Sequence, residues 1–438
     1  MEKPTRPTKI RWLIVLLLVG LVFLAHFNRI SITVAGNANF IGPGKLTKVQ
    51  AGIVYSAFLF VYTLGMLPGG WLIDRYGPRR LMTCMGLGFG FWSVVTGLLG
   101  WTGLSIAALF VPLLIIRGLA GAASIPLHPG AARAVSLWTP LRERSTANGL
   151  ITAGALVGIA LCYPWFGWLM DHVGWPLAFV ICGGALMVFG GLWWLLSADD
   201  AASHPATNVA ERDLLVHETT AARNRATPRE IGRLFLNPSL VLLTLSYGAV
   251  GYVQYLFFYW IEYYFGKVLK VTPEASRESA FVITMAMAVG MALGGGISDF
   301  VCRRLGHRWG CRLVAFAGMG LGAGFSLLGI TTSDPQVITR WFSLAFGALG
   351  LCEGIFWTTA PRLEPRNGAL ACALVNTGGN GIGMLAPFVT PIIAERFGWS
   401  SAIFVACLIC AVGGLLWLGI GHASEKHVDS AGSRQNQG

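Results

Sequence analysis

Two arginine residues lie inside apolar stretches that are long enough to cross a membrane. Arg29 falls in the stretch from residue 12 to 36, and Arg117 in the stretch from 104 to 136. A guanidinium keeps its proton at physiological pH and costs about 3 kcal/mol at the centre of a membrane helix. Each arginine must therefore face protein, water or an anion. Two such cations in one half of the chain predict a small anionic ligand.

One glutamate is embedded in another apolar stretch. Glu353 lies between residues 346 and 357, about 12 Å from the end of its helix. An internal repeat offset places it at the level of His128, and a histidine beside a carboxylate titrates near neutral pH. We expect both residues to serve in proton coupling. The alternatives are a structural ion pair or a buried neutral acid for Glu353, and simple packing for His128.

Uncharged polar side chains in the second half of the chain could form hydrogen bonds with a ligand. The tyrosines follow an i, i+3, i+7 pattern on one helical face, and the two asparagines lie one turn apart. We expect these groups to bind the cargo with the arginines: Tyr252, Gln254, Tyr255, Tyr259, Asn376 and Asn380. The alternatives are an interfacial tyrosine belt and polar contacts between helices.

The composition predicts the elements that carry these residues. Hydrophobic residues make up 54% of the 438 residues, charged residues only 12%, and the mean hydropathy is +0.62. These values exclude a water-soluble globule and a disordered chain. Apolar runs of membrane length predict an all-α membrane protein with twelve transmembrane helices. The runs are 12–36, 50–73, 81–100, 104–136, 145–170, 175–197, 239–265, 279–301, 311–331, 338–360, 368–394 and 399–421.

The basic residues indicate an orientation in the membrane. The net charge is +12, but lysines and arginines follow every second apolar run and form no single patch, so we expect no nucleic-acid partner. By the positive-inside rule both termini are cytoplasmic, in a multi-pass protein of the plasma (inner) membrane. The first run is too long for a signal segment and is read as a retained helix. Lys267, Lys270 and Arg277 depart from the charge pattern.

A polar linker and an internal repeat predict two halves. Gly174-Trp175-x-x-Ala178 recurs as Gly398-Trp399-x-x-Ala402, an offset of 224 residues (398 minus 174). Such duplication is typical of transporters built from two pseudo-symmetric six-helix bundles. We expect bundles at 1–197 and 239–422, a cytoplasmic linker at 198–238 and a disordered tail at 423–438.

No pattern for a metal site, a cofactor or catalysis is evident. The nine cysteines lie mostly inside apolar runs, at spacings that fit neither a disulfide framework nor a tetrahedral metal site. We expect them to pack as small hydrophobic residues. Phosphate loops, nucleophile elbows and dinucleotide fingerprints are absent, so the sequence predicts no enzyme.

Two loops carry a recurring motif. GWLIDRYGPRR spans residues 70–80, and GGISDFVCRR at 295–304 is a weaker copy. These resemble the signature loop of the major facilitator superfamily, which implies that they act in gating and not in substrate binding. The alternative for the arginines is that they only set topology. The residues concerned are Gly70, Asp74, Arg75, Gly77, Arg79, Arg80, Asp299, Arg303 and Arg304.

A narrower resemblance surrounds Arg117. Gly121, Pro129-Gly130, Ser136-Leu137-Trp138, Arg144 and Ala147-Asn148-Gly149 follow the pattern of the anion:cation symporter family. That family moves organic anions such as sugar acids, usually with protons. The pair Asn28-Arg29 stands where the family carries Asp-Arg, and Ser124 where it carries a glutamate. The resemblance implies that Asn28, Arg29 and Arg117 belong to the anion site and that another group must bind the proton.

Together these observations predict a secondary active transporter of a small organic anion, such as a sugar acid, with H⁺ as coupling ion and alternating access. We expect a monomer in the lipid bilayer. Two alternatives stay open: an exporter of drugs or of cationic or neutral small molecules on the same fold, and a membrane-bound nutrient sensor with little flux.

Overall fold

The computed structural model describes residues 7–216, 232–364 and 368–421. Within these residues the chain is almost entirely helical, and its one β-bridge joins Ile41 to Leu46. The predicted tail at 423–438 and the middle of the predicted linker lie outside the described residues. The limits predicted for the two bundles and the linker stay a prediction.

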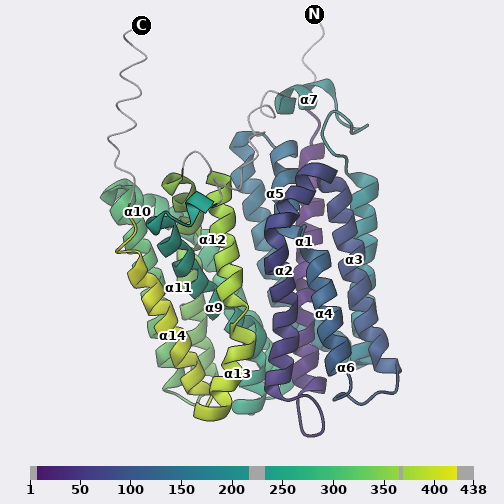
Figure 1. The fold of residues 1–438 in the computed structure, drawn as a ribbon, viewed down its shortest axis with the longest axis vertical. Coiled ribbons are helices and arrows are strands. Elements are labelled where there is room, and N and C mark those ends of the chain that lie inside the picture. Colours follow the sequence, from purple (N-terminus) through teal and green to yellow (C-terminus); the bar gives the residue numbers. More distant parts are fainter. Residues whose placement is uncertain (1–6, 217–231, 365–367, 422–438) are drawn as a thin grey trace, which may run out of the picture.

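The first half of the chain forms one bundle (Figure 1). Its helices are α1 (Ile10–Ala35), α2 (Lys48–Tyr76), α3 (Pro78–Leu98), α4 (Phe110–Ser124), α5 (Leu127–Trp138) and α6 (Leu141–Leu196). A π-helical turn, η1 (Gly36–Phe40), extends α1, and a 3₁₀ turn, η2 (Leu99–Trp101), extends α3. A short helix, α7 (Val209–Val216), follows this bundle.

The second half forms a bundle beside the first and repeats several of its features (Figure 1). Its helices are α9 (Pro238–Tyr263), α10 (Pro273–Ile330), α11 (Pro335–Leu363), α12 (Gly368–Gly383), α13 (Ala386–Phe397) and α14 (Trp399–Leu416). The π-helical turn η4 (Tyr264–Val268) extends α9, as η1 extends α1. These repeated irregularities agree with a duplicated architecture.

Two of these helices reverse at a glycine. Gly174 in α6 has φ 79° and ψ 156°, and Gly306 in α10 has φ 78° and ψ 154°. Only glycine adopts this backbone region without strain, so each residue joins two membrane-crossing segments. Nine helices of the described chain are long and apolar enough to cross a membrane. Because α6 and α10 each cross twice and α12 with α13 crosses once more, the fold has twelve crossings.

Two predicted spans are interrupted. The run at 104–136 becomes α4 and α5, which meet at Pro126, and the run at 368–394 becomes α12 and α13, which meet just before Pro387. A proline lacks the N–H that would continue the helical hydrogen bonds, so the helix breaks there. The first break lies in the fourth crossing of its bundle and the second in the fifth crossing of its bundle, so the repeat does not relate them.

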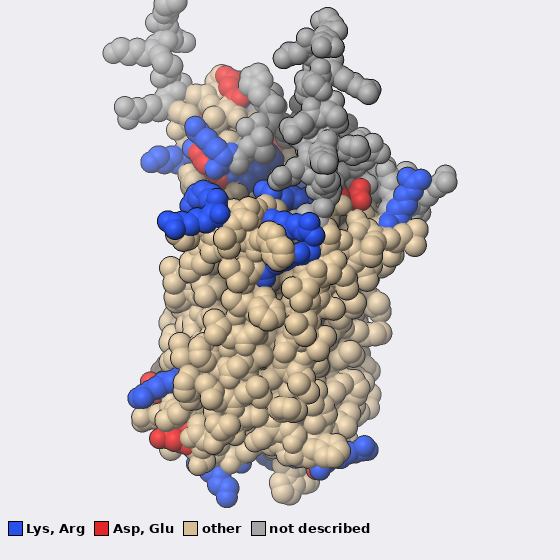
Figure 2. Space-filling view, turned by 90° about the vertical axis from the view of Figure 1, so that its left-hand side faces the viewer, with Lys and Arg blue, Asp and Glu red and all other residues tan. Residues whose placement is uncertain are grey.

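Charge separates the two ends of the molecule. The described chain begins and ends at the end that carries α7, here called the α7 end (Figure 1). On the face shown in Figure 2, lysines and arginines gather at this end, while the middle is covered by uncharged residues. Membrane proteins typically carry their lysines and arginines on the cytoplasmic side, so this charge distribution favours a cytoplasmic α7 end.

Candidate functional site

Arg29 lies on α1 at the boundary between the two bundles. Its side chain is buried, and its Nε donates to the hydroxyl of Tyr259 on α9 at 3.4 Å. The guanidinium carbon is 5.0 Å from the ring centre of Tyr255 and 5.5 Å from that of Phe58. Its Nη2 is buried and has no hydrogen-bond partner in the described part of the chain. A buried N–H of a charged group that lacks a protein acceptor can donate a hydrogen bond to a bound anion.

Arg117 approaches Arg29 from α4. It is buried, and its Nη2 donates to the backbone carbonyl oxygen of Arg29 at 3.0 Å. The guanidinium carbon lies 4.8 Å from the ring centre of Phe58, and within residues 7–216, 232–364 and 368–421 Nε has no hydrogen-bond partner. Among the described residues no carboxylate lies within salt-bridge distance of either arginine. The two cations therefore share an aromatic wall and lack a counter-ion.

The tyrosine and asparagine residues link this pair of cations to the second bundle. The ring of Tyr255 faces Arg29, and its hydroxyl donates to Oδ1 of Asn380 at 2.5 Å. The side-chain amide of Asn380 donates to the backbone and side-chain oxygens of Asn376 at 2.9 and 3.2 Å. Arg29 is thus connected through Tyr255 to polar groups of α12. The structure brings these predicted residues together across the two bundles.

Two predicted ligands lie outside this group. Asn28 is fully buried and donates to backbone oxygens of Leu24 and Cys182, while its own oxygen accepts from Ser93 at 2.8 Å. These contacts tie α1 to α3 and α6 and support a packing role. Tyr252 is buried on α9 without a described contact to Arg29. We leave both residues out of the site proposed below.

Glu353 lies on α11 within the second bundle. The hydroxyl of Tyr247 donates to its Oε1, and the amide of Gln254 donates to its Oε2 at 3.3 Å. Gln254 precedes Tyr255 on α9, so neighbouring residues of one helix contact Glu353 and Arg29. All of the partners described for Glu353 are neutral. A carboxyl group in such a setting can exchange a proton without breaking an ion pair.

The predicted approach of His128 to Glu353 is not among the described contacts. The ring of His128 instead lies 5.3 Å from the ring of His26, near the start of α5. His26 bonds through Nδ1 to the backbone oxygen of Val22 at 2.9 Å. The two histidines thus belong to the first bundle, whereas Glu353 belongs to the second. The repeat offset gave the depth of His128 but not the direction of its side chain.

The gating motif lies at the α7 end in both copies. Asp74 is 3.9 Å from Nε of Arg133, and Arg79 donates to the backbone oxygen of Trp194 at 2.8 Å. Gly77, at φ 79°, separates α2 from α3. The other motif residues are Gly70, where a Cβ would meet open space, Arg75, stacked on Trp71, and the exposed Arg80, Asp299, Arg303 and Arg304. Their described contacts stay within their own bundle.

A charged network that was not predicted from the sequence lies at the opposite end of the molecule. Arg277 on α10 pairs with Asp171 on α6 and lies 3.6 Å from Glu262 on α9. Glu262 in turn accepts from the amide of Asn37 in η1 at 3.2 Å. Glu353 is therefore not the single carboxylate buried in the spans. The one available signal was the departure of Arg277 from the expected charge pattern.

The contacts between the bundles favour this opposite end. Tyr163 donates to the backbone oxygen of Phe258 at 2.8 Å, and Ser56 donates to that of Met384 at 2.8 Å. A third contact is the ion pair between Lys48 and Glu395 at 3.7 Å. In the described residues the α7 end has no hydrogen bond or ion pair between bundles. The structure is thus joined on the side away from α7.

Comparisons with known proteins agree with this architecture. The family model described as "Major Facilitator Superfamily" matches residues 14–360 and, in a second match, residues 279–436. A solved structure of a bacterial homolog of the human lysosomal transporter Spinster, inward-facing and unoccupied, is similar with a TM-score of 0.74 and 17% sequence identity. That likeness covers 94% of this chain and 96% of the other, and it concerns the fold.

Two relatives in sequence are named as transporters of sugar acids. A protein of Bacillus subtilis described as "Probable galactarate/D-glucarate transporter" is 29% identical over 89% of this chain and 86% of its own length. A "D-galactonate transporter" of Escherichia coli is 27% identical over 94% of this chain and 96% of its own length. The chain thus spans most of each relative.

Proposed function

Because the chain belongs to the major facilitator superfamily, whose members are membrane transporters and not enzymes, we propose that it carries a small organic anion of the sugar-acid class by alternating access. The observation that carries this proposal is the pair of buried guanidinium groups, Arg29 and Arg117. Each has a buried N–H group that finds no acceptor among the residues the structure describes. A carboxylate would supply those acceptors in a setting of low dielectric, where charge-assisted hydrogen bonds are strong.

The surroundings of the pair favour a hydroxylated acid over a plain aliphatic one. Tyr255 and Tyr259 contact Arg29, and the hydroxyl of Tyr255 connects them to the amide groups of Asn380 and Asn376. A polyhydroxylated chain needs several donors and acceptors of this kind, whereas an aliphatic chain would leave them unpaired. The names of the two sugar-acid relatives support the same substrate class.

Glu353 is the proposed site of the coupling proton. It is buried, its described partners are neutral, and one of them, Gln254, directly precedes Tyr255, which contacts Arg29. Proton binding there would change the charge of the second bundle beside the cargo, which gives cargo and proton a common binding step. His128 stays a weaker candidate, because its described ring contact is with His26.

In alternating access, the two bundles would be joined at one end of the molecule in one state and at the other end in the other state. Asp171, Arg277 and Glu262 join the bundles at the end opposite α7. The motifs around Asp74 and Asp299 would join them at the α7 end in the other state. We place the α7 end and both termini in the cytoplasm, in the plasma (inner) membrane, and we propose a monomer in the lipid bilayer. The proposed bundle limits are 1–197 and 239–422.

Counterflow in proteoliposomes tests the proposal. Vesicles that contain the purified protein and unlabelled D-galactonate should accumulate labelled D-galactonate, and external D-glucarate should compete with it. Organic cations should not compete. Binding without flux would favour a sensor, and competition by cations alone would favour an exporter of cationic molecules. Either result would overturn the proposed function.

A further inference from the structure

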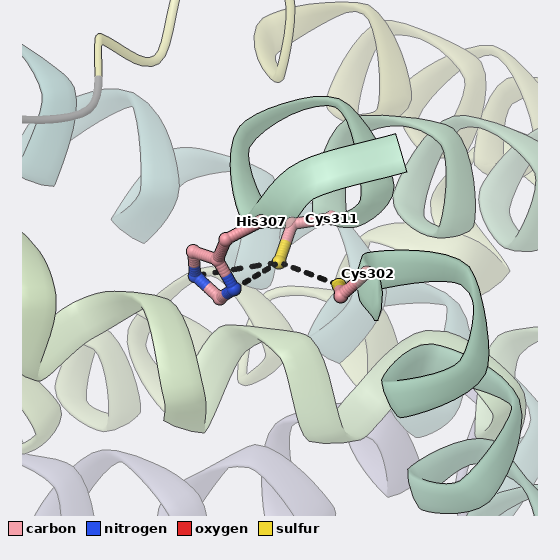
Figure 3. A group of neighbouring side chains, drawn as sticks. All are labelled: Cys302, His307 and Cys311. Atoms are coloured by element: carbon pink, nitrogen blue, oxygen red, sulfur yellow. Dashed lines mark hydrogen bonds between the residues drawn. The ribbon is translucent and has the colours of Figure 1, made fainter. Parts of the chain in front are cut away.

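We propose that Cys302, His307 and Cys311 form a binding site for a thiophilic divalent cation of the Zn²⁺ class. The three side chains meet at the reversal between the two halves of α10, at the α7 end (Figure 3). Each can offer one ligand atom, and all these atoms lie within 4.8 Å of one another. In Figure 3 the sulfur of Cys311 lies between the ring of His307 and the sulfur of Cys302.

The distances fit a tetrahedral site. The two sulfur atoms are 3.7 Å apart, and both ring nitrogens of His307 are 3.6 Å from the sulfur of Cys311. With Zn–S bonds of about 2.3 Å and Zn–N bonds of about 2.0 to 2.1 Å, neighbouring ligand atoms of a tetrahedron are roughly 3.5 to 3.8 Å apart. A rotation of the half-buried imidazole would direct one nitrogen to the ion. Water would complete the fourth position.

The local fold explains why these residues meet. His307 and Cys311 are four residues apart on the second half of α10, so they share a face. Gly306, at φ 78°, turns the chain back on the helix that carries Cys302. A Cβ at Gly310 would come within 2.6 Å of the Cα of Cys302, so only a glycine there permits this approach. The cysteine spacing alone predicted packing roles, because the site depends on this reversal.

The donor set selects the class of cation. Two thiolates and one imidazole are soft ligands that prefer Zn²⁺ or Cu⁺ over Ca²⁺ and Mg²⁺, which require oxygen. Binding of Zn²⁺ displaces the proton of each thiol, so the two thiolates cancel the charge of the ion. A neutral complex suits a neighbourhood that is rich in arginine. These arginines are Arg303, Arg304, Arg308 and Arg312.

The site would connect a cation to the second gating loop. Cys302 directly precedes Arg303 and Arg304 and follows Asp299 by three positions. An ion held between Cys302 and the start of the next helix would fix the two halves of α10 at the end that bears the gating motif. This binding is separate from the anion site, because Arg29 and Arg117 lie in the first bundle.

Cobalt binding provides a direct test. The purified full-length protein, with any affinity tag removed and its thiols reduced, is titrated with Co²⁺ and then with Zn²⁺. We expect one Co²⁺ per chain with thiolate-to-cobalt charge-transfer absorption, which Zn²⁺ displaces. Cys302→Ser and His307→Gln should each weaken Zn²⁺ binding at least about tenfold, since even indirect partners of a metal ligand contribute about 10- to 100-fold. The exposed Cys84 supplies the control variant Cys84→Ser.

Thermal unfolding shows whether each variant is folded and whether Zn²⁺ stabilises it, so a loss of binding can be told from a folding defect. Cys302 and His307 are half-buried, so their variants are chosen over a change at the fully buried Cys311. Zn²⁺ should raise the Tm of the wild type and of Cys84→Ser, but not that of Cys302→Ser. Absence of charge-transfer absorption in the wild type, or equal Zn²⁺ affinity in Cys302→Ser and the wild type, would overturn the proposal.

Discussion

Arg117 donates a hydrogen bond from Nη2 to the backbone carbonyl oxygen of Arg29, at 3.0 Å. One buried cation is thus positioned by the main chain of the residue that carries the other. The bond connects α4 to α1, and the ring of Phe58 on α2 lies against both guanidinium groups. Three helices of the first bundle therefore fix the pair before any ligand binds.

Arg117→Lys should weaken transport although it preserves the positive charge. A lysine cannot both reach the carbonyl oxygen of Arg29 and present the planar fork that binds a carboxylate. A hydrogen bond to a charged group contributes about 1.5 to 3 kcal/mol, so we expect the KM for D-galactonate to rise roughly 10- to 100-fold. Uptake in proteoliposomes measures this effect. The exposed Arg142 supplies the control Arg142→Lys; equal KM values in both variants would contradict an anion-binding role.

Glu353→Gln should separate exchange from proton-driven accumulation. The amide keeps the size of the side chain and can still bond with Tyr247 and Gln254, but it cannot exchange a proton. We expect counterflow to continue while accumulation driven by an inward proton gradient falls at least about tenfold. The control is Glu278→Gln, at an exposed position of α10. Undiminished accumulation in Glu353→Gln would remove this residue from the coupling scheme.

Arg277→Gln should destabilise the protein far more than Asp171→Asn. The side chain of Asp171 is 44% exposed, whereas those of Arg277 and Glu262 are 5% and 7% exposed. Loss of Arg277 leaves Glu262 buried without a cation, at a cost of about 3 to 5 kcal/mol, while an exposed partner contributes at most about 1 kcal/mol. Thermal unfolding in detergent measures the difference.

A second substitution tests the reason for that loss. Glu262→Gln combined with Arg277→Gln removes both buried charges, so the double variant should recover much of the stability that Arg277→Gln loses. If the double variant is less stable than Arg277→Gln alone, burial of an unpaired Glu262 is not the cause.

Tyr255→Phe should alter selectivity more than stability. The ring remains against Arg29, but the hydroxyl that donates to Asn380 is lost. A hydrogen bond of this kind contributes about 0.5 to 1.5 kcal/mol, so the KM for D-galactonate should rise roughly 2- to 10-fold. The KM for a short carboxylate without hydroxyls, if transported, should change less. Tyr263→Phe, at the last position of α9, is the control; an equal effect on both acids would argue against hydroxyl recognition.

The fold could be predicted from the sequence largely because lipid imposes a simple rule. A membrane helix needs about 20 apolar residues, and every predicted run corresponds to a helical crossing. The breaks near Pro126 and Pro387 were not predicted, because a proline can also be tolerated as a mild kink. The reversals at Gly174 and Gly306 fall in the short gaps between runs and follow from the backbone freedom of glycine.

The candidate site could be predicted only where a residue is unusual by itself. Arg29, Arg117 and Glu353 stand out as charges in apolar helices. Phe58 does not, because an aromatic residue in a membrane helix is common and its position beside two cations depends on the packing of α2. The contact between Asp171 and Arg277 joins residues 106 positions apart, which no periodicity along one helix can reveal.

The two buried guanidinium groups, which have no carboxylate partner among the described residues, also bear on the return step of a transport cycle. Without cargo, the bundles would have to close around like charges that repel each other, and low dielectric strengthens that repulsion. On this reasoning the empty carrier would resist reorientation, so that exchange outpaces net flow and slippage is suppressed. A dianionic acid would cancel both charges and a monoanion only one, so the valence of the cargo would set the speed of the cycle.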